Sequence, residues 1–232
     1  MKFSHIQFKV KELHRAVTDF RKLGFVVEYG KEPKQATNAF IWFGQGAFFE
    51  IITMPKVAEK LAYPLGILYG KGMRLRWQKY AGLKGGIADI GIEGKTPKRA
   101  SMDYMKQIRE NFQKEGISCS KIMTESRKAP NKPKTQFSFF VPDNPNLPLV
   151  TSAYSIMQKP MESHHENGIT GIKWVKVQCS SQEKIQFQKM LGDETHIKFV
   201  EGEEFKICSI CFEGAKDGLD EAYLHGLIVE YE

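Results

Sequence analysis

The chain has 232 residues, enough for one large or two small domains with a buried core. Its 41% hydrophobic and 26% charged residues are ordinary for a soluble globular protein, and no apolar run approaches the roughly 20 residues that span a bilayer. The formal charge of +7 can favour nucleic acid, but no helix-turn-helix, zinc-finger or RNP-like motif occurs, so a Lys-rich solubilising surface is the preferred interpretation. No signal peptide is evident and four scattered cysteines make no disulfide framework, so a reduced, cytoplasmic protein is expected.

The first 54 residues predict a β-α-β-β-β unit. Ile6, Phe8 and Val10 alternate with polar residues, as in a half-buried strand. Apolar residues then recur at helical spacing over 13–23, and Gly24 ends the helix. Three further strands are predicted at Phe25–Tyr29, Asn38–Phe43 and Ala47–Thr53.

Residues 55–84 form a predicted connector of two short helices or turns, in which Arg76 and Trp77 are expected near the mouth of any cleft. An Arg beside a Trp can bind an anion or stack on a ligand, which makes both residues candidates for substrate binding. More often such an Arg packs its stem on the ring at a domain seam, and that interpretation is preferred.

A second β-α-β-β-β unit is predicted over 85–154. The alternation over 87–92 suggests its first strand, and Thr96 and Pro97 favour the start of a helix that runs to about Lys114. Its other strands are predicted at Ile117–Thr124, Thr135–Pro142 and Leu147–Tyr154. Because the order of elements repeats, we expect the first two units to pair into one cupped sheet.

A polar connector over 155–167 leads to a third βαβββ-like unit over 168–232. Ser180 or Ser181 caps its helix and Gly192 ends it, with strands at His196–Val200, Glu204–Glu213 and Leu227–Tyr231. This unit has no mate within the chain to cover its strand edge and apolar face. We therefore expect it to pair with the same unit of a second chain in a symmetric homodimer.

His5 lies on the first predicted strand and Glu50 on the fourth. A β-α-β-β-β order with these two residues resembles the module of the glyoxalase, bleomycin-resistance and extradiol-dioxygenase superfamily (vicinal oxygen chelate). The resemblance implies an α+β fold in which repeated βαβββ modules form cupped mixed sheets. It also implies that side chains on strands one and four, here His5 and Glu50, hold a divalent metal, which would be Zn, Ni, Fe or Mn.

Two short motifs look most like the glyoxalase-like domain branch of this superfamily. One is the Thr37-Asn38 pair before the third strand. The other is the run 165–168 before the third unit, where the branch often has His-Pro-Asn-Gly and this chain has Glu166 in place of the proline. With these motifs the resemblance covers nearly the whole chain.

A metal site of this kind draws on two modules, and the sequence shows only one half of it. The corresponding positions of the second module hold Ile87 and Ala88, with Asp89 one step away, and Thr151 or Ser152. The third unit offers Glu230 without further ligands. Two interpretations therefore stay open: a metal bound at His5 and Glu50, or a hydrogen-bonded pair of these side chains that lines a pocket.

Two classes of function follow from these residues. The first is an enzyme, a lyase, isomerase or dioxygenase, that acts on a small oxygenated metabolite in the cup of the first two modules. Glu50 would then serve as general base and His5 as its acid partner, with Asn38 orienting a ligand oxygen or else bonding its own backbone. The alternative is a metal-free protein that binds and sequesters a small molecule, as bleomycin-resistance-type relatives do.

Overall fold

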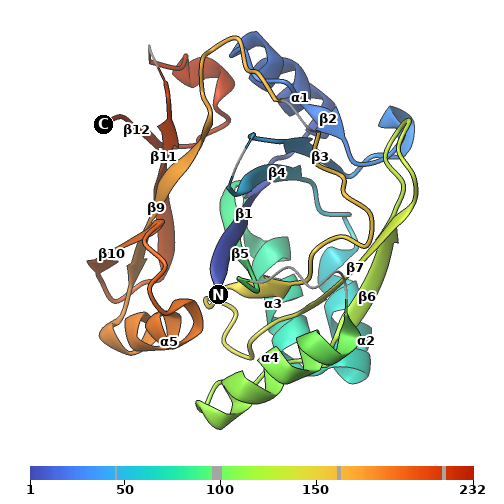
Figure 1. Ribbon diagram of the computed structural model, residues 1–232, viewed down its shortest axis with the longest axis vertical. Helices are drawn as coiled ribbons and strands as arrows, with labels where there is room; N and C mark the ends of the chain where they lie inside the picture. The colour runs from blue at the N-terminus through green and yellow to red at the C-terminus, as the bar shows by residue number, and fades with distance from the viewer. Residues whose placement is uncertain (45, 96–100, 161–162, 216–217) are drawn as a thin grey trace.

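The computed structural model describes residues 1–44, 46–95, 101–160, 163–215 and 218–232, and within these ranges the strands form two sheets (Figure 1). The larger sheet has eight strands in the order β2-β3-β4-β1-β5-β8-β7-β6. These strands are β1 (Lys2–Lys9), β2 (Glu28–Tyr29), β3 (Asn38–Ile41), β4 (Phe48–Ile52), β5 (Gly86–Glu93), β6 (Met123–Arg127), β7 (Thr135–Phe140) and β8 (Leu149–Thr151).

The eight-stranded sheet has an internal two-fold pattern centred on β1 and β5. These two strands pair antiparallel, and each pairs in parallel with the last strand of its own unit, β1 with β4 and β5 with β8. Apolar side chains such as Ile6, Phe8 and Ile90 point to one face, where α1 (Leu13–Lys22) and α4 (Met102–Lys114) cover them. The α+β fold with a curled mixed sheet is thereby confirmed.

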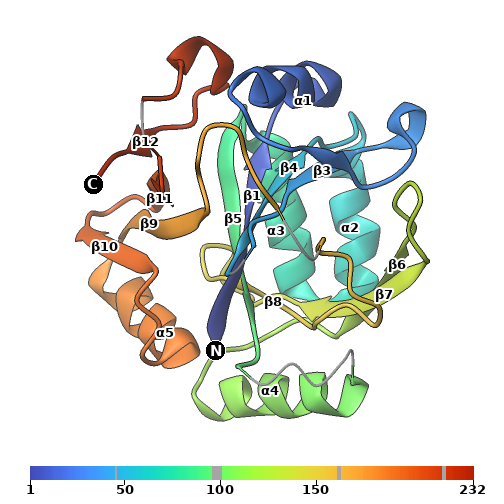
Figure 2. The same ribbon diagram turned by 45° about the horizontal axis from the view of Figure 1, so that its top comes forward.

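The connector between the first two units forms two helices, α2 (Ala58–Tyr69) and α3 (Lys71–Gly82), of 12 residues each, which is longer than predicted. Gly70 separates them with a φ of 112°, a left-handed conformation that favours glycine. The two helices lie side by side against the larger sheet (Figure 2). No helix in the described part of the chain is long and apolar enough to cross a membrane.

In the second unit, one predicted strand begins later than expected, and one predicted helix start falls outside the described residues. The strand expected at Ile117–Thr124 begins only at Met123, because residues 118–120 bond the turn at 141–143 across the end of the sheet instead of following β7. The predicted helix start at Thr96 and Pro97 lies outside the described residues. Within them, Ser101 caps α4 by accepting a hydrogen bond from the Tyr104 backbone N–H.

The third unit forms the smaller sheet, in the order β10-β9-β11-β12. Its strands β9 (Gly171–Cys179) and β11 (Lys206–Glu213) pair antiparallel in its middle, as β1 and β5 do in the larger sheet. Ser180 and Glu183 form a capping box at the start of α5 (Ser181–Leu191). The remaining elements are η1 (Pro33–Gln35), β10 (Ile197–Glu201), η2 (Glu221–Tyr223) and β12 (Val229–Glu230).

The apolar face of the third unit, which was expected to need a partner chain, is covered within this chain. Phe212 on β11 contacts the rings of Phe25, Phe43 and Phe49, so that one continuous core joins the third unit to the first. The homodimer stays a prediction, for which the outer strands β10 and β12 and exposed apolar residues such as Ile185 and Ile228 offer a surface.

The run 165–168, which carried part of the resemblance, ties the second connector to the end of α1. The Asn167 amide donates to the Leu23 carbonyl at 2.8 Å, and the Glu166 backbone N–H donates to the Gly24 carbonyl at 2.9 Å. His165 accepts a hydrogen bond from the Val26 N–H through Nδ1. A proline in place of Glu166 would have no N–H to donate, so in this chain the motif has a structural role that the substitution strengthens.

Candidate functional site

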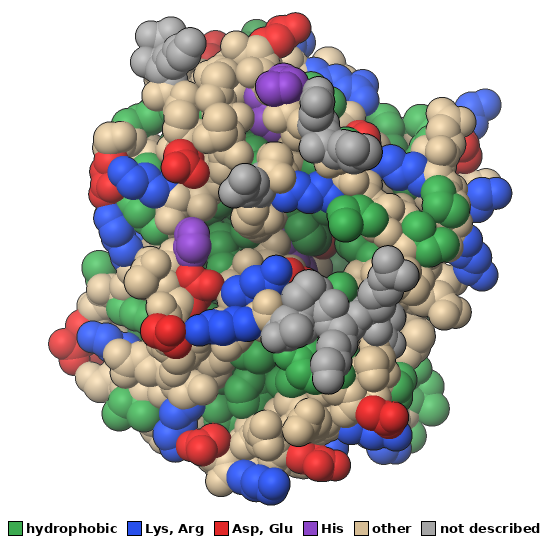
Figure 3. Space-filling view, viewed as in Figure 1, with side chains coloured by type: hydrophobic (Ala, Val, Ile, Leu, Met, Phe, Trp, Pro, Cys, Tyr) green, Lys and Arg blue, Asp and Glu red, His purple; other side chains and the backbone are tan. Residues whose placement is uncertain are grey.

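The open face of the larger sheet and helix α3 together line a cavity of 1020 Å³, which we call the cup. Figure 3 looks onto this face, where hydrophobic side chains line a central hollow and Lys and Arg side chains gather around it. The walls are largely aromatic, from Phe40, Trp42, Phe48, Phe137, Phe139 and Tyr154. A cavity of this size and lining suits a small organic molecule.

Glu50 on β4 is the best positioned reactive group of the cup. The strand register places it between Gln7 on β1 and Phe40 on β3. The Gln7 amide donates to its Oε2 at 3.0 Å, and the Asn38 amide donates to its Oε1 at 2.8 Å. Both donors are neutral, so the carboxylate is oriented without being neutralised and retains lone pairs for a ligand. Asn38 therefore orients Glu50, a role that the sequence did not suggest.

His5 on β1 also faces the cup, but it is not hydrogen-bonded to Glu50. Its ring stacks on Phe48 with centroids 4.7 Å apart, and its Nδ1 lies 3.3 Å from the Ser4 hydroxyl. The other side of the ring fills the space above Gly91, its cross-strand neighbour on β5. Burial lowers the pKa of the imidazole and outweighs the opposing effect of the Glu50 charge, so His5 is neutral at neutral pH.

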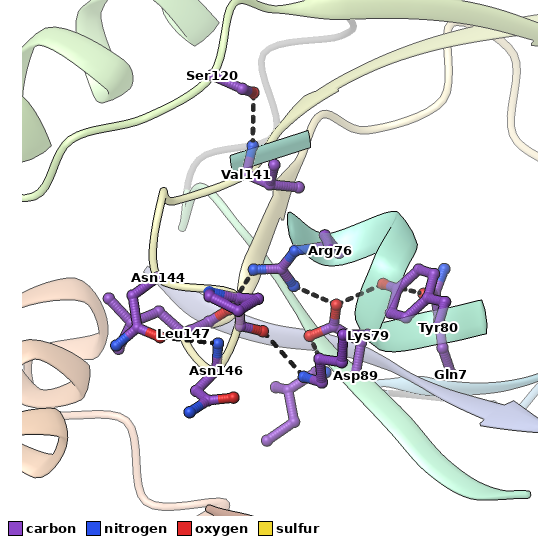
Figure 4. A network of polar contacts seen from close by, with 12 residues as sticks. Gln7, Arg76, Lys79, Tyr80, Asp89, Ser120, Val141, Asn144, Asn146 and Leu147 are labelled. Atoms are coloured by element: carbon purple, nitrogen blue, oxygen red, sulfur yellow. Dashed lines mark hydrogen bonds and ion pairs between the residues drawn. The ribbon is translucent and has the colours of Figure 1, made fainter. Parts of the chain in front are cut away.

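Asp89 on β5, the cross-strand partner of Gln7, is withdrawn from any ligand by its neighbours (Figure 4). Its Oδ2 accepts hydrogen bonds from the Arg76 guanidinium and the Tyr80 hydroxyl, both on α3. Arg76 is 2% exposed, and its second nitrogen donates to the Leu147 carbonyl at 2.6 Å. The Tyr80 oxygen also lies 2.9 Å from Gln7 Oε1, which connects this network to the amide that orients Glu50.

The two substrate-binding candidates of the connector differ in their availability. The Arg76 guanidinium is committed to Asp89 and a backbone carbonyl, which agrees with the preferred interpretation of a seam residue. Trp77 lines the cup but packs against Met73, Val141 and Leu149. Both residues therefore shape the wall of the cup more than they offer free polar groups.

The side chains of the described residues do not fit a catalytic divalent metal. His5 and Glu50 are two donors, whereas such a site needs three or four, and no group of three or more His, Cys, Asp or Glu side chains is placed to hold an ion in the described ranges. Where the second module would contribute, the register sets Gly91 opposite His5, and Asp89 is already neutralised by Arg76. No chemical step is therefore derived through a metal.

The residues of the cup that the sequence analysis missed include Gln7, Arg127, Glu125 and Tyr154. Arg127 is 6% exposed and lies among aromatic rings, although a lone Arg in a Lys-rich run gives no such signal. Glu125, two residues earlier on β6, lies at the mouth, where partial loss of water and then the Glu50 charge raise the pKa of its carboxyl. Burial raises the pKa of Tyr154, which stays protonated.

Comparisons with known proteins agree with this fold. A family model described as a glyoxalase-like domain matches residues 3–190. No curated protein matches the sequence. A hypothetical protein from Staphylococcus aureus superposes with a TM-score of 0.70 at 13% identity, covering 100% of this chain and 98% of that one.

Two enzymes of known structure are also similar. The 2,3-dioxygenase LapB from Pseudomonas sp. KL28 has a TM-score of 0.51 at 14% identity, covering 91% of this chain and 74% of that one. The Mn(II)-bound glyoxalase from Novosphingobium aromaticivorans has a TM-score of 0.54 at 10% identity, covering 90% of this chain and 64% of that one. At these identities the similarity shows a shared fold and leaves the reaction to be argued from the site.

Proposed function

The chain belongs to the glyoxalase-like domain family, and on this basis we propose that it is a lyase or isomerase acting by proton transfer on a small oxygenated metabolite in the cup. The observation that carries the proposal is the Glu50 carboxylate, which two neutral side-chain amides orient on the open face of the sheet. A carboxylate held in this way is a general base with a fixed direction of attack.

In the proposed reaction, Glu50 takes a proton from a carbon atom next to a ligand carbonyl, and the electron pair of the broken C–H bond moves to the carbonyl oxygen. Neutral His5 keeps an N–H that can donate to the enolate oxygen. In an α-hydroxyketone, the hydroxyl proton of the attacked carbon moves to the enolate oxygen, and return of the abstracted proton to the former carbonyl carbon then completes an isomerisation. Expulsion of a leaving group from the carbon next to the attacked one instead completes an elimination. Both outcomes need only residues that line the cup.

Of the reactions that the resemblance implied, proton transfer fits this donor set better than ring cleavage by dioxygen. A dioxygenase of the superfamily depends on a metal ion, for which the described residues supply His5 and Glu50 alone. The second candidate function is binding without catalysis. It is favoured by the wide aromatic lining, which can retain a flat molecule without any chemistry.

Hydrogen–deuterium exchange into candidate ligands tests the proposal. Proton NMR in D₂O would follow a panel of 2-oxo acids and α-hydroxyketones with wild-type protein, Glu50→Gln and the exposed control Glu110→Gln. We expect exchange at carbon with the wild type and the control, and a loss of at least about a hundredfold with Glu50→Gln. Equal exchange by Glu50→Gln would contradict the proposal. Binding of panel members without exchange would favour the sequestering function.

A further inference from the structure

We propose that the ligand of the cup carries an oxyanion, a carboxylate or a phosphate monoester, which binds the guanidinium of Arg127. The inference deepens the proposed function, since it names the chemical class of the molecule that occupies the same cup. It depends on Arg127 on β6, a cation that is 6% exposed and lines the cavity.

Arg127 is held by aromatic faces and has no anionic partner among the described residues. Its guanidinium carbon lies 4.1 Å from the ring centroid of Phe40, 4.8 Å from that of Tyr154 and 5.8 Å from that of Trp42. Its Nε and Nη1 atoms are buried and make no hydrogen bond. Cation–π contacts stabilise the charge but satisfy none of its N–H donors, so the site is left with donors to offer.

Buried polar groups without partners are uncommon, and a buried guanidinium is especially costly to leave unpaired. Arg76, which is also buried, differs in its terminal nitrogens, which are paired with Asp89 and a backbone carbonyl although its Nε likewise makes no hydrogen bond. A ligand oxyanion would give Arg127 the same kind of partner, and the planar guanidinium suits a carboxylate or phosphate.

The position of Arg127 brings this anion site close to Glu50. β6 and β3 stand near opposite edges of the larger sheet, yet Arg127 lies over Phe40, so the curled sheet nearly closes at this point. Phe40 is in turn the cross-strand neighbour of Glu50. A small molecule in the part of the cup beside Phe40 can therefore present its anionic end to Arg127 and its reactive carbon to Glu50.

The surface around Arg127 also favours anions. Arg127 also borders a second hollow, of 830 Å³. Four lysines and the carboxylate of Glu32 line this hollow; the lysines are Lys31, Lys128, Lys132 and Lys134, of which Lys132 is paired with Glu28. The carboxylates of Glu50 and Glu125 act against an anion, so binding of an anion in the cup depends on direct pairing with Arg127.

Isothermal titration calorimetry with three matched probes tests the inference: benzoate, phenyl phosphate and the neutral benzamide. We expect both anions to bind more tightly than benzamide, and Arg127→Met to weaken them by on the order of ten- to a hundredfold without affecting benzamide. Arg127→Lys keeps the charge and should lose less. Arg15→Met, which removes an exposed Arg on α1, should change nothing. A preference for phenyl phosphate over benzoate would identify the ligand group as a phosphate.

Equal affinity for benzoate and benzamide, no measurable binding of either anion, or an undiminished preference in a folded Arg127→Met variant would each overturn the inference. Its failure is distinguishable from failure of the proposed reaction. Glu50→Gln should abolish proton exchange while anion binding is retained or strengthened, because a nearby negative charge is removed. Anion binding at Arg127 without any exchange would support this inference and leave a sequestering protein.

Discussion

Replacement of Arg76 by Met should destabilise the protein far more than the loss of an ordinary ion pair. The Arg76 and Asp89 side chains are each 2% exposed, and their contact lies at the junction of α3 and β5. Without Arg76, the Asp89 carboxylate would retain only the Tyr80 hydroxyl and the Ile90 backbone N–H as donors. The Leu147 carbonyl would also lose its partner.

Breaking a buried pair by removing one partner costs about 3–5 kcal/mol, because an uncompensated charge stays buried. A domain has a total stability of roughly 5–15 kcal/mol, so this is a large fraction of it. With a urea m-value of about 3 kcal/mol/M for a chain of this size, the midpoint should fall by about 1–1.7 M. The double variant Arg76→Met/Asp89→Asn removes both charges and should recover most of the loss.

Urea unfolding followed by tryptophan fluorescence measures these midpoints, since Trp77 is next to Arg76 in sequence. Lys2→Met is the matched control, because its ion pair with Glu93 also ends on β5, at 2.9 Å, but the two side chains are 42% and 21% exposed. That pair should contribute less than about 1 kcal/mol. A loss in Arg76→Met as small as in the control, or a double variant as unstable as the sum of the single ones, would refute the reasoning.

Three further predictions concern the cup and two buried histidines, His5 and His165. In Gly91→Ala, the added Cβ would stand 2.0 Å from His5 Cε1, so urea unfolding should show a loss of about 1–3 kcal/mol that the open site Gly82→Ala does not share. Burial lowers the pKa of His5 and His165 from 6.5, so both side chains are held neutral in the folded protein. As the pH drops below 6.5, the free energy of unfolding should therefore fall, by up to about 1.4 kcal/mol per pH unit for each histidine. Asn at either position should make the free energy of unfolding less dependent on pH. Elemental mass spectrometry of untagged protein should find less than one equivalent of Zn, Ni, Fe or Mn, whereas a full equivalent that vanishes in His5→Ala and Glu50→Ala would contradict the incomplete ligand set.

The fold was predictable because the apolar residues of its core recur at every second position in strands and at every third or fourth position in helices. Ile6 and Phe8 on β1 are fully buried while Gln7 faces the cup, and Ser180 and Gly192 mark the ends of α5 as expected. The lengths of α2 and α3 were underestimated because α2 exposes much of its apolar surface, which blurs the amphipathic pattern. Its exposed apolar residues are Leu61, Tyr63, Ile67 and Leu68.

The sequence predicted a site residue only where its residue type and its position on a predicted strand were enough to single it out. His5 and Glu50 were found through the order of the elements, and both line the cup. The partners of Glu50 depend on strand register, and Arg76 meets Asp89 across 13 positions of sequence through tertiary packing alone. Arg127 gave no signal at all, because its environment is created by the meeting of two sheet edges that are far apart in the chain.

The cup also shows how two units with the same backbone order can form a site in which the two halves have different roles. β1 and β5 are related by the internal two-fold pattern, but the carboxylates beside Gln7 have different partners. Asp89 is paired with Arg76, whereas Glu50 accepts its side-chain hydrogen bonds from the neutral amides of Gln7 and Asn38 and lines the cavity. Pairing Asp89 with Arg76 leaves Glu50 as the oriented carboxylate on the sheet, while Glu125 lies at the mouth, where partial loss of water and the Glu50 charge raise the pKa of its carboxyl. Arg127 at the seam then determines which end of a ligand can approach Glu50.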